Sequence, residues 1–247
     1  MYNMKRMLIC LSVLLIMAFV VTACGSANDS KSEVASNSEQ KVLRVGVDDT
    51  YPPMEFKDDS NTTVGFDIDV ATELAKRMGM KAEFISNDWA GIFLALEANK
   101  FDVIISSVSR NEERLANYAM TTPYIANAQV IVVPADNTTI KEPKDLEGKK
   151  VGVQINTTAD ESCAEYLKTM KFTLTQYDQV IQPFSDMKAG RLDAIVVDEV
   201  VARYYVSRDP KSYKVSSARL TNEPIGICFA KNNTELRDKA QKALDEM

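Results

Sequence analysis

The stretch "GFDIDVATELAKRMGMKAEFIS" (residues 65–86) decides the fold class, because a helical pattern runs directly into a strand pattern. Between residues 67 and 80, apolar side chains recur at helical spacing, and Gly79 closes the predicted helix. The segment 82–86 follows at once as a short, apolar strand. A helix that leads straight into a strand is the repeating unit of α/β proteins.

The same alternation continues on both sides of this stretch. A strand over 42–47 precedes it, and a helix over 89–98 and a strand over 102–106 follow it. The second half repeats the pattern, with strands predicted over 128–133, 150–154, 172–177, 193–197 and 225–230, and helices over 158–170, over 199–207 and from residue 234. We therefore expect parallel sheets that carry helices on both faces.

Two segments connect the halves. Residues 121–129 ("TTPYIANAQ") are predicted to cross from the first half to the second, and residues 220–226 ("LTNEPIG") are predicted to return the chain to the first half. Because each carries a proline between strand patterns, they favour two lobes joined by a hinge over one continuous sheet. The predicted first lobe comprises residues 41–126 plus 228–247, and the second lobe comprises residues 127–227.

The N-terminal residues read as an export signal. Lys5 and Arg6 precede an apolar run that is shorter than the ~20 residues needed to span a bilayer, so residues 1–23 are predicted to be a signal peptide. The run ends in Val-Thr-Ala-Cys24, which resembles a bacterial lipobox, and a plain signal peptide with an incidental cysteine is the alternative. Residues 24–40 lack large apolar side chains and predict a flexible tether. We thus expect an extracytoplasmic protein anchored to the membrane by a diacylglyceryl group on Cys24.

Composition excludes several classes of function. The chain of 247 residues has a net charge of −6, which argues against nucleic-acid binding. It contains no histidine, so Ser-His-Asp catalysis and histidine-ligated zinc are excluded. It also has neither a Cys-x-x-Cys pair nor a Gly-x-Gly motif, and we expect no metal and no cofactor. Cys163 and Cys228 are compatible with a disulfide and equally with two free thiols.

Polar residues gather where the predicted strands end. Ligands of open α/β sheets bind beyond the carboxyl ends of the strands, so these residues are the candidate site. In chain order, the candidates are Asp48, Tyr51, Glu55, Trp89, Ser106, Ser107, Ser109, Arg114, Thr157, Thr158 and Asp198.

The candidates have complementary charges. A guanidinium such as that of Arg114 binds a carboxylate with two parallel hydrogen bonds, and a carboxylate such as that of Asp198 binds an ammonium. Because a lone buried charge costs several kcal/mol, we expect a ligand to complete both, and a free amino acid carries both groups. The alternatives are that the serines and Asp198 serve as turn and cap residues, that Arg114 is a solvated helix residue, and that Trp89 belongs to the core.

Four segments resemble the extracellular amino-acid-binding proteins of bacterial ABC importers, the polar amino acid group or solute-binding protein family 3. They are "DDTYPPMEF" (48–56), "GFDIDVATELAKRMG" (65–79), "SSVSRNEER" (106–114) and "AGRLDAIVVDEVVA" (189–202). The resemblance extends from about Val42 to the C-terminus and implies a two-lobed periplasmic-binding-protein type II fold with two hinge crossovers.

The resemblance also implies a role for each candidate. Arg114 would bind the ligand carboxylate, helped by Ser107, by Ser109 and by the backbone N–H of Thr158. Asp198 would bind the ammonium. Tyr51 and Trp89 would sandwich the ligand side chain, and Asp48 would reach its distal end.

The sequence departs from the family pattern in places. Arg110 and Asn111 stand where an apolar residue and a threonine are usual, so we expect an altered helix cap. Asn156 replaces a usual glycine, so the loop before Thr158 is expected to differ in shape. The family also continues beyond "QKALDEM", and a truncated C-terminus is one interpretation.

The predicted function is the substrate-binding component of an amino-acid ABC importer. It would act as a monomer that is not an enzyme, close two lobes around a free L-amino acid and deliver it to the permease subunits in the membrane. Asp48, Glu55 and two aromatic faces favour a basic ligand such as arginine or lysine. The alternatives are glutamine or another polar amino acid, a dehydratase-like enzyme on the same fold, and a sensor lipoprotein.

Overall fold

The computed structural model describes residues 40–247. The predicted signal peptide, Cys24 and nearly all of the predicted tether lie outside the described residues. Within residues 40–247, no helix combines the length and the apolar character that a membrane crossing requires.

The first lobe is built on a five-stranded mixed sheet in the order β5-β1-β6-β13-β7. Its strand β1 (Lys41–Val47) pairs in parallel with β5 (Met80–Ser86) and with β6 (Val103–Ile104). The strand β13 (Cys228–Ala230) returns from the far end of the chain and lies antiparallel to both β6 and β7 (Tyr118–Met120). The C-terminal segment therefore completes the sheet that the N-terminal segment begins.

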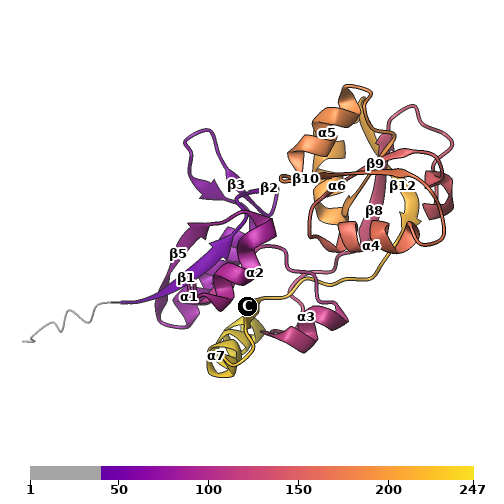
Figure 1. The fold of residues 1–247 in the computed structure, drawn as a ribbon. Helices are drawn as coiled ribbons and strands as arrows, with labels where there is room; N and C mark the ends of the chain where they lie inside the picture. The colour runs from indigo at the N-terminus through magenta and orange to yellow at the C-terminus, as the bar shows by residue number, and fades with distance from the viewer. Residues whose placement is uncertain (1–39) are drawn as a thin grey trace, which may run out of the picture. The chain divides into compact units, whose positions relative to one another are not determined.

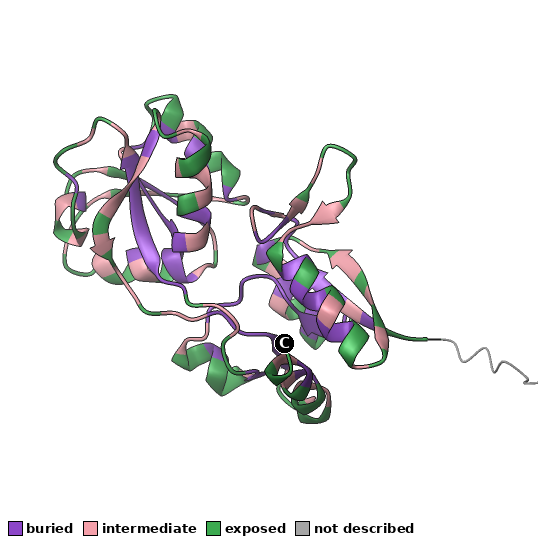
Figure 2. Ribbon diagram, turned by 180° about the vertical axis from the view of Figure 1, so that it is seen from behind, coloured by how far each residue is buried: buried purple, intermediate pink, exposed green. Residues whose placement is uncertain are grey.

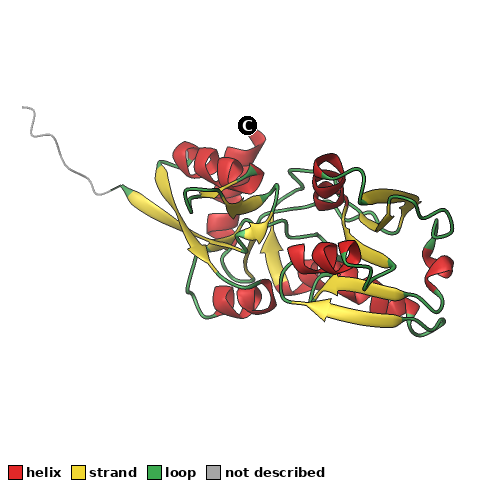
Figure 3. Ribbon diagram, turned by 90° about the horizontal axis from the view of Figure 1, so that it is seen from above, coloured by secondary structure: helices red, strands yellow, loops and turns green. Residues whose placement is uncertain are grey.

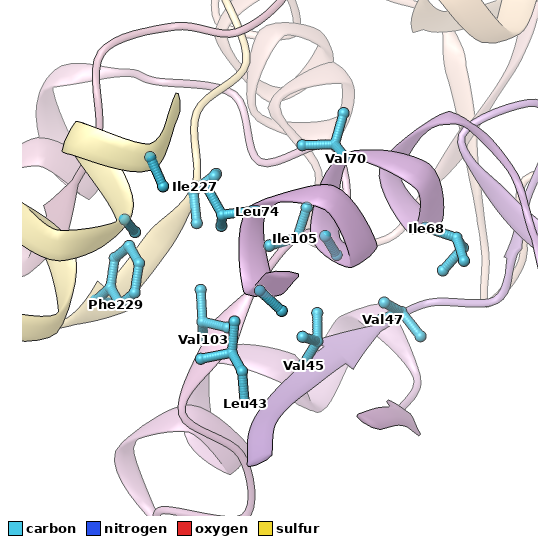
Figure 4. Packing of buried hydrophobic residues seen from close by; sticks show 14 of the residues in the cluster. Leu43, Val45, Val47, Ile68, Val70, Leu74, Val103, Ile105, Ile227 and Phe229 are labelled. Carbon is cyan, nitrogen blue, oxygen red and sulfur yellow. The ribbon is translucent and has the colours of Figure 1, made fainter. Parts of the chain in front are cut away.

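Helices cover both faces of this sheet (Figure 1). On one face, α1 (Phe66–Arg77) and α7 (Thr234–Asp245) bury their apolar sides against β1 and β13. Figure 4 shows Leu74 of α1 above Val45 of β1, with Phe229 of β13 beside them. On the other face, α2 (Trp89–Glu97) packs on Phe101 and Ile104.

The second lobe repeats the plan with a second five-stranded sheet in the order β10-β9-β11-β8-β12. Three of its strands run in parallel, namely β10 (Thr173–Tyr177), β9 (Lys150–Gln154) and β11 (Ala194–Asp198). The other two, β8 (Gln129–Pro134) and β12 (Tyr213–Arg219), complete an antiparallel edge.

The helices of the second lobe are α4 (Thr158–Tyr166), α5 (Ile181–Lys188) and α6 (Glu199–Arg208), together with the short 3-10 helix η1 (Pro143–Leu146). Figure 3 shows helices flanking the strands, and Figure 2 shows that the strands of this sheet carry much of the buried surface.

Two segments cross between the sheets, as the sequence predicts. One leads from β7 to β8, and the other leads from β12 to β13. Ile225 on the return segment bridges to Ser109 and to Ile125, so the crossings are tied together by backbone contacts. This arrangement confirms the predicted two-lobed α/β fold, while the division of the chain at residues 126 and 228 stays a prediction.

Several elements differ from the expectation. Both sheets are mixed and not parallel, because each crossover segment returns a strand in the opposite direction. The predicted strand 102–106 is reduced to Val103–Ile104, the predicted helix 158–170 ends at Tyr166, and the strand predicted from 225 begins at Cys228. The structure adds α3 (Glu112–Asn117) and a small sheet of β2 (Thr50–Tyr51), β3 (Glu55–Lys57) and β4 (Thr63–Val64).

The two described cysteines are free thiols. Cys163 lies in the core of the second lobe, and Cys228 lies beside α2 in the first. Burial raises the pKa of each thiol to about 12. The disulfide that the sequence left open is therefore not formed in this structure.

Candidate ligand-binding cleft

All eleven candidate residues line one cleft between the two lobes. The cleft encloses about 420 Å³, counting the space at its mouth. The first lobe contributes the residues from Asp48 to Arg114, and the second contributes Thr157, Thr158 and Asp198. The structure also adds residues that were not in the predicted set, namely Gln129, Gln154, Ala159, Val180, Val196 and Val197.

Arg114 is a buried cation with few polar partners in the described part of the chain. It lies on α3, and the side-chain oxygen of the N-cap residue Asn111 accepts from the Arg114 backbone N–H at 2.8 Å. Its guanidinium donates to the Ser109 carbonyl at 3.1 Å and faces the Trp89 ring at 5.4 Å. Burial lowers the pKa of Arg114, although the charge of Glu161 opposes the change. Since no salt bridge forms to Arg114 within residues 40–247, its remaining N–H groups are available to an anion in the cleft.

Asp198 is a buried anion that already has partners. It sits where β11 meets α6, yet its carboxylate makes no capping hydrogen bond to that helix. Instead it accepts from the Tyr51 hydroxyl at 2.7 Å, from Asn127 at 2.7 Å and from Gln129 at 2.6 Å. Burial raises the pKa of Asp198, and these three donors act against the rise. All three donors are neutral and no cation forms a salt bridge to Asp198 within residues 40–247, so its completion by a ligand ammonium stays a prediction.

Asp48 makes a second contact across the cleft. Its carboxylate accepts from the Thr50 hydroxyl at 2.6 Å within the first lobe and from Gln154 at 2.9 Å in the second. Burial raises its pKa. Asp48 thus combines a bond to its own loop with a bond that exists only when the lobes meet.

The three serines have different surroundings. Ser106 accepts from the Asp48 backbone N–H and donates to Glu55 at 2.6 Å, so its hydroxyl is fully engaged inside the first lobe. Ser107 commits both its backbone N–H and its hydroxyl to Asp67. Ser109 lies nearest the second lobe, with its hydroxyl 3.5 Å from that of Thr158. Of the three, Ser109 is best placed to contact a ligand near Arg114.

Trp89 is anchored across the cleft by its indole. Its Nε1–H donates to the carbonyl of Asn156 at 2.9 Å, and its ring packs edge-on to Phe93. Asn156 has a φ of 59°, in the left-handed region that asparagine tolerates better than most residues. Asparagine therefore fits the left-handed turn found here, and the expected difference in loop shape from other family members stays a prediction.

Thr157 and Thr158 begin α4. Thr157 is the N-cap, since its hydroxyl accepts from the Asp160 backbone N–H. Thr158 is the first residue of this nine-residue helix and is buried on the cleft wall. Because a helix N-terminus favours an anion, the end of α4 complements Arg114.

Gln129 is the main site residue that the sequence reasoning missed. It starts β8, and no sequence signal marks the amino end of a strand as part of a site. Because β8 runs antiparallel to β11, its amino end lies opposite the carboxyl end of β11, and Gln129 pairs with Asp198 in the register. Gln154 stands directly after an apolar strand pattern, where the sequence places polar residues, but it was not in the predicted set.

The fold and the cleft define a class, that of two-lobed α/β binding proteins. The chain belongs to the bacterial extracellular solute-binding proteins, family 3, whose family model matches residues 43–247. This result confirms the family resemblance.

Known relatives cover nearly the whole chain. The L-cystine-binding protein TcyJ of Escherichia coli (strain K12) is 31% identical, over 94% of this chain and 88% of its own length. The arginine-binding extracellular protein ArtP of Bacillus subtilis (strain 168) is 32% identical, over 99% of this chain and 93% of its own length. A solved structure of an ancestral arginine-binding protein bound to arginine has a TM-score of 0.80 and 40% identity, over 83% of this chain and 92% of that one. These relatives are binding proteins, so the prediction that the chain is not an enzyme is confirmed.

Proposed function

We propose that this protein is the substrate-binding component of an amino-acid ABC importer and that its cleft binds a free L-amino acid with a basic side chain. The proposal rests mainly on one observation: a buried cation, Arg114, from one lobe and a buried anion, Asp198, from the other line the same cleft. An amino acid is a small ligand that carries a carboxylate for the first and an ammonium for the second.

The ligand carboxylate would lie between Arg114 and the N-terminus of α4. Arg114 has free N–H groups, and the Ser109 and Thr158 hydroxyls lie side by side next to it. The ammonium would then approach Asp198, which is held in place by Asn127 and Gln129. Both charges of the ligand would be desolvated and paired, which favours tight binding.

The remaining charges of the cleft favour a cationic side chain. Asp48 and Glu55 line the same cleft as Asp198, whereas Arg114 is the one cation among the lining residues that the structure describes. The faces of Tyr51 and Trp89 add surfaces that attract a guanidinium or an ammonium. The names of ArtP and of the ancestral arginine-binding protein agree with a basic ligand.

Closure of the lobes is the proposed mechanism. Hydrogen bonds connect the lobes directly, among them those from Tyr51 to Asp198, from Gln154 to Asp48 and from Trp89 to Asn156. A ligand that bridges Arg114 and Asp198 adds to these bonds in the closed form alone and so shifts the equilibrium toward it. The closed form would then be recognised by the permease.

An uncharged amino acid is the main alternative. TcyJ is named for cystine, and carboxylates such as that of Asp48 also accept hydrogen bonds from amides. Calorimetric titration with the twenty amino acids and cystine separates the alternatives. We expect L-arginine or L-lysine to bind at least tenfold tighter than L-glutamine or L-cystine. The opposite order would reject the basic ligand and leave the amino-acid cleft standing.

We also propose that the mature protein is a monomer tethered outside the cytoplasm by lipid on Cys24. Mass spectrometry of the protein purified from membranes tests the anchor. A diacylglyceryl group on Cys24 is expected, and a Cys24→Ala variant should be recovered without lipid. An unmodified Cys24 in the membrane-extracted protein would reject the anchor without affecting the cleft.

A further inference from the structure

Two carboxyl groups meet at the base of the cleft in the first lobe. Glu55 on β3 lines the cleft, and Asp67 in the first turn of α1 lies directly behind it. The Asp67 backbone N–H donates to the carbonyl of Met54, the residue before Glu55, at 2.8 Å, and the adjacent hydroxyls of Ser106 and Ser107 donate to Glu55 and to Asp67, so the two carboxyl groups are neighbours. Both residues are buried, with exposed fractions of 1% and 0%.

Asp67 accepts more hydrogen bonds than Glu55 does. Asp67 accepts three hydrogen bonds, from the Ser107 backbone N–H at 2.7 Å, from the Ser107 hydroxyl at 3.1 Å and from the Tyr124 hydroxyl at 2.8 Å. Glu55 accepts one, from Ser106 at 2.6 Å, and its Oε2 is buried without any donor in the described part of the chain. No cation forms a salt bridge to either carboxyl within residues 40–247.

This difference places a proton on Glu55. Two carboxylates in contact in a buried site are not both ionised, because their repulsion is not screened by water. Burial, and then the charge of Asp67, raise the pKa of Glu55 well above its usual value. Burial also raises the pKa of Asp67, but its hydrogen bonds favour the anion. If Glu55 is neutral, its Oε2–H can donate to Asp67, and Oε2 then no longer lacks a hydrogen-bond partner.

We propose that Glu55 and Asp67 share one proton in the free cleft and that a cationic amino-acid side chain releases this proton when it binds beside Glu55. The proton leaves Oε2 for solvent, and the positive charge of the ligand takes its place next to the new carboxylate. An uncharged side chain brings no charge and leaves the proton on the pair. Asp67, which does not line the cleft, thereby acts as a positioning residue that makes ligand selection depend on pH. The inference rests on the proposed basic ligand.

Other ionisable groups face the pair and the cleft. Asp48 and Tyr51 lie on the loop and strand beside Glu55, Tyr124 donates to Asp67, and Asp198 faces them from the second lobe. The ammonium of any amino acid acts on Asp198 to the same extent, so a comparison of a cationic with an uncharged ligand removes that contribution. Asp48 is the one further carboxyl that a cationic side chain would affect, and a variant distinguishes it.

Calorimetry in buffers with different heats of ionisation counts the protons released. L-arginine and its uncharged isostere L-citrulline are the probes. We expect L-arginine to release up to about one proton more than L-citrulline at neutral pH, and its affinity to rise up to about tenfold per pH unit. Equal release by both ligands, or no release by L-arginine, overturns the inference.

Variants assign the proton to its source. Glu55→Gln should abolish the additional release, and Asp67→Asn should reduce it, because the neighbouring charge is gone. Asp69→Asn is the matched control, since Asp69 lies in the same helical turn but is exposed, and it should release as many protons as the unaltered protein. Release that survives Glu55→Gln and disappears in Asp48→Asn would place the proton on Asp48 and overturn the inference.

Infrared spectroscopy gives a readout that needs no variant. The free protein should show the carbonyl band of a buried protonated carboxyl, and L-arginine, but not L-citrulline, should remove it. Absence of this band from the free protein at neutral pH overturns the shared proton. If neither L-arginine nor L-lysine binds, the proposed basic ligand fails together with this inference. Binding of L-arginine without proton release overturns this inference alone.

Discussion

The hydroxyl of Tyr51 donates a hydrogen bond of 2.7 Å to the carboxylate of Asp198, and this bond joins the two lobes across the cleft. The acid proposed to bind the ligand ammonium is thus also a contact that closes the protein. Oδ2 of Asp198 accepts from Tyr51, and its second lone pair is open to a ligand ammonium, so one carboxylate would hold both the other lobe and the ligand. Ligand binding and lobe closure are therefore coupled at Asp198.

Removing the Tyr51 hydroxyl should favour the open form of the free protein. We expect Tyr51→Phe to shift the balance between closed and open lobes by about 1 kcal/mol, the usual value of one such bond. Small-angle scattering of the free protein would record this as a larger radius of gyration. Tyr177→Phe is the matched control, because the Tyr177 hydroxyl donates to Asp186 at the same 2.7 Å within the second lobe. An equal change in both variants would contradict a role for Tyr51 in closure.

Replacing Arg114 should weaken binding far more than it weakens folding. Lysine keeps the charge but loses the planar pair of donors, so we expect Arg114→Lys to raise the dissociation constant for the bound amino acid about 100-fold. Titration calorimetry measures the effect, and thermal unfolding checks that the fold is retained. A dissociation constant within threefold of the original would show that the guanidinium does not hold the ligand.

The stability of the second lobe should depend on Glu199 in a pH-dependent way. Burial raises the pKa of this carboxyl, but Arg203 and Arg219, which both form ion pairs with it, outweigh burial and hold its pKa below the usual range. A lowered pKa means that the stabilisation is present above the pKa of the unfolded chain and is lost as the pH falls through the folded pKa.

We therefore expect Glu199→Gln to lower the free energy of unfolding by about 1 kcal/mol at neutral pH, with the difference shrinking in acid. Urea unfolding at neutral pH and at acidic pH measures the difference in the free energy of unfolding. Glu165→Gln removes an exposed ion pair with Lys168 and should change stability little at either pH. If the loss of unfolding free energy in Glu199→Gln stays constant with pH, the ion pairs of Glu199 do not supply the pH-dependent stability.

The hinge contains a close approach that a single methyl group should disturb. A Cβ at Gly226 would lie 2.6 Å from Cδ of Arg110 and 3.3 Å from the carbonyl of Thr121. We expect Gly226→Ala to destabilise the protein by about 1–3 kcal/mol. Combining it with Arg110→Ala should recover part of the loss, and a double-mutant cycle in urea measures the coupling. If the effects of the two substitutions on the free energy of unfolding simply add, the Arg110 side chain moves aside at no cost and the predicted clash is wrong.

Much of the site could be predicted because it follows a topological rule. Asp198 and Ser106 both come just after apolar strands, and the carboxyl ends of parallel strands gather at one edge of a sheet. Arg114 and Trp89 lie on helices, and they entered the candidate set through their charge and their aromatic ring, with roles that the family resemblance then implied.

The rest depended on contacts between distant parts of the chain. Gln129 stands at the amino end of an antiparallel strand, so its proximity to Asp198 follows from strand direction, which the alternation of elements does not determine. The bond from Tyr51 to Asp198 joins residues in different lobes and exists because the lobes are closed. The commitment of Ser107 to Asp67 arises from the packing of α1 against the loop after β6.

The central claim is that one amino acid joins Arg114 and Asp198 across the cleft. A crystal structure of the complex with the amino acid that binds most tightly tests this claim most directly. The account predicts that the ligand carboxylate accepts two hydrogen bonds from the Arg114 guanidinium while the ammonium donates to Asp198. A ligand bound in the reverse orientation, or outside the cleft, would contradict it.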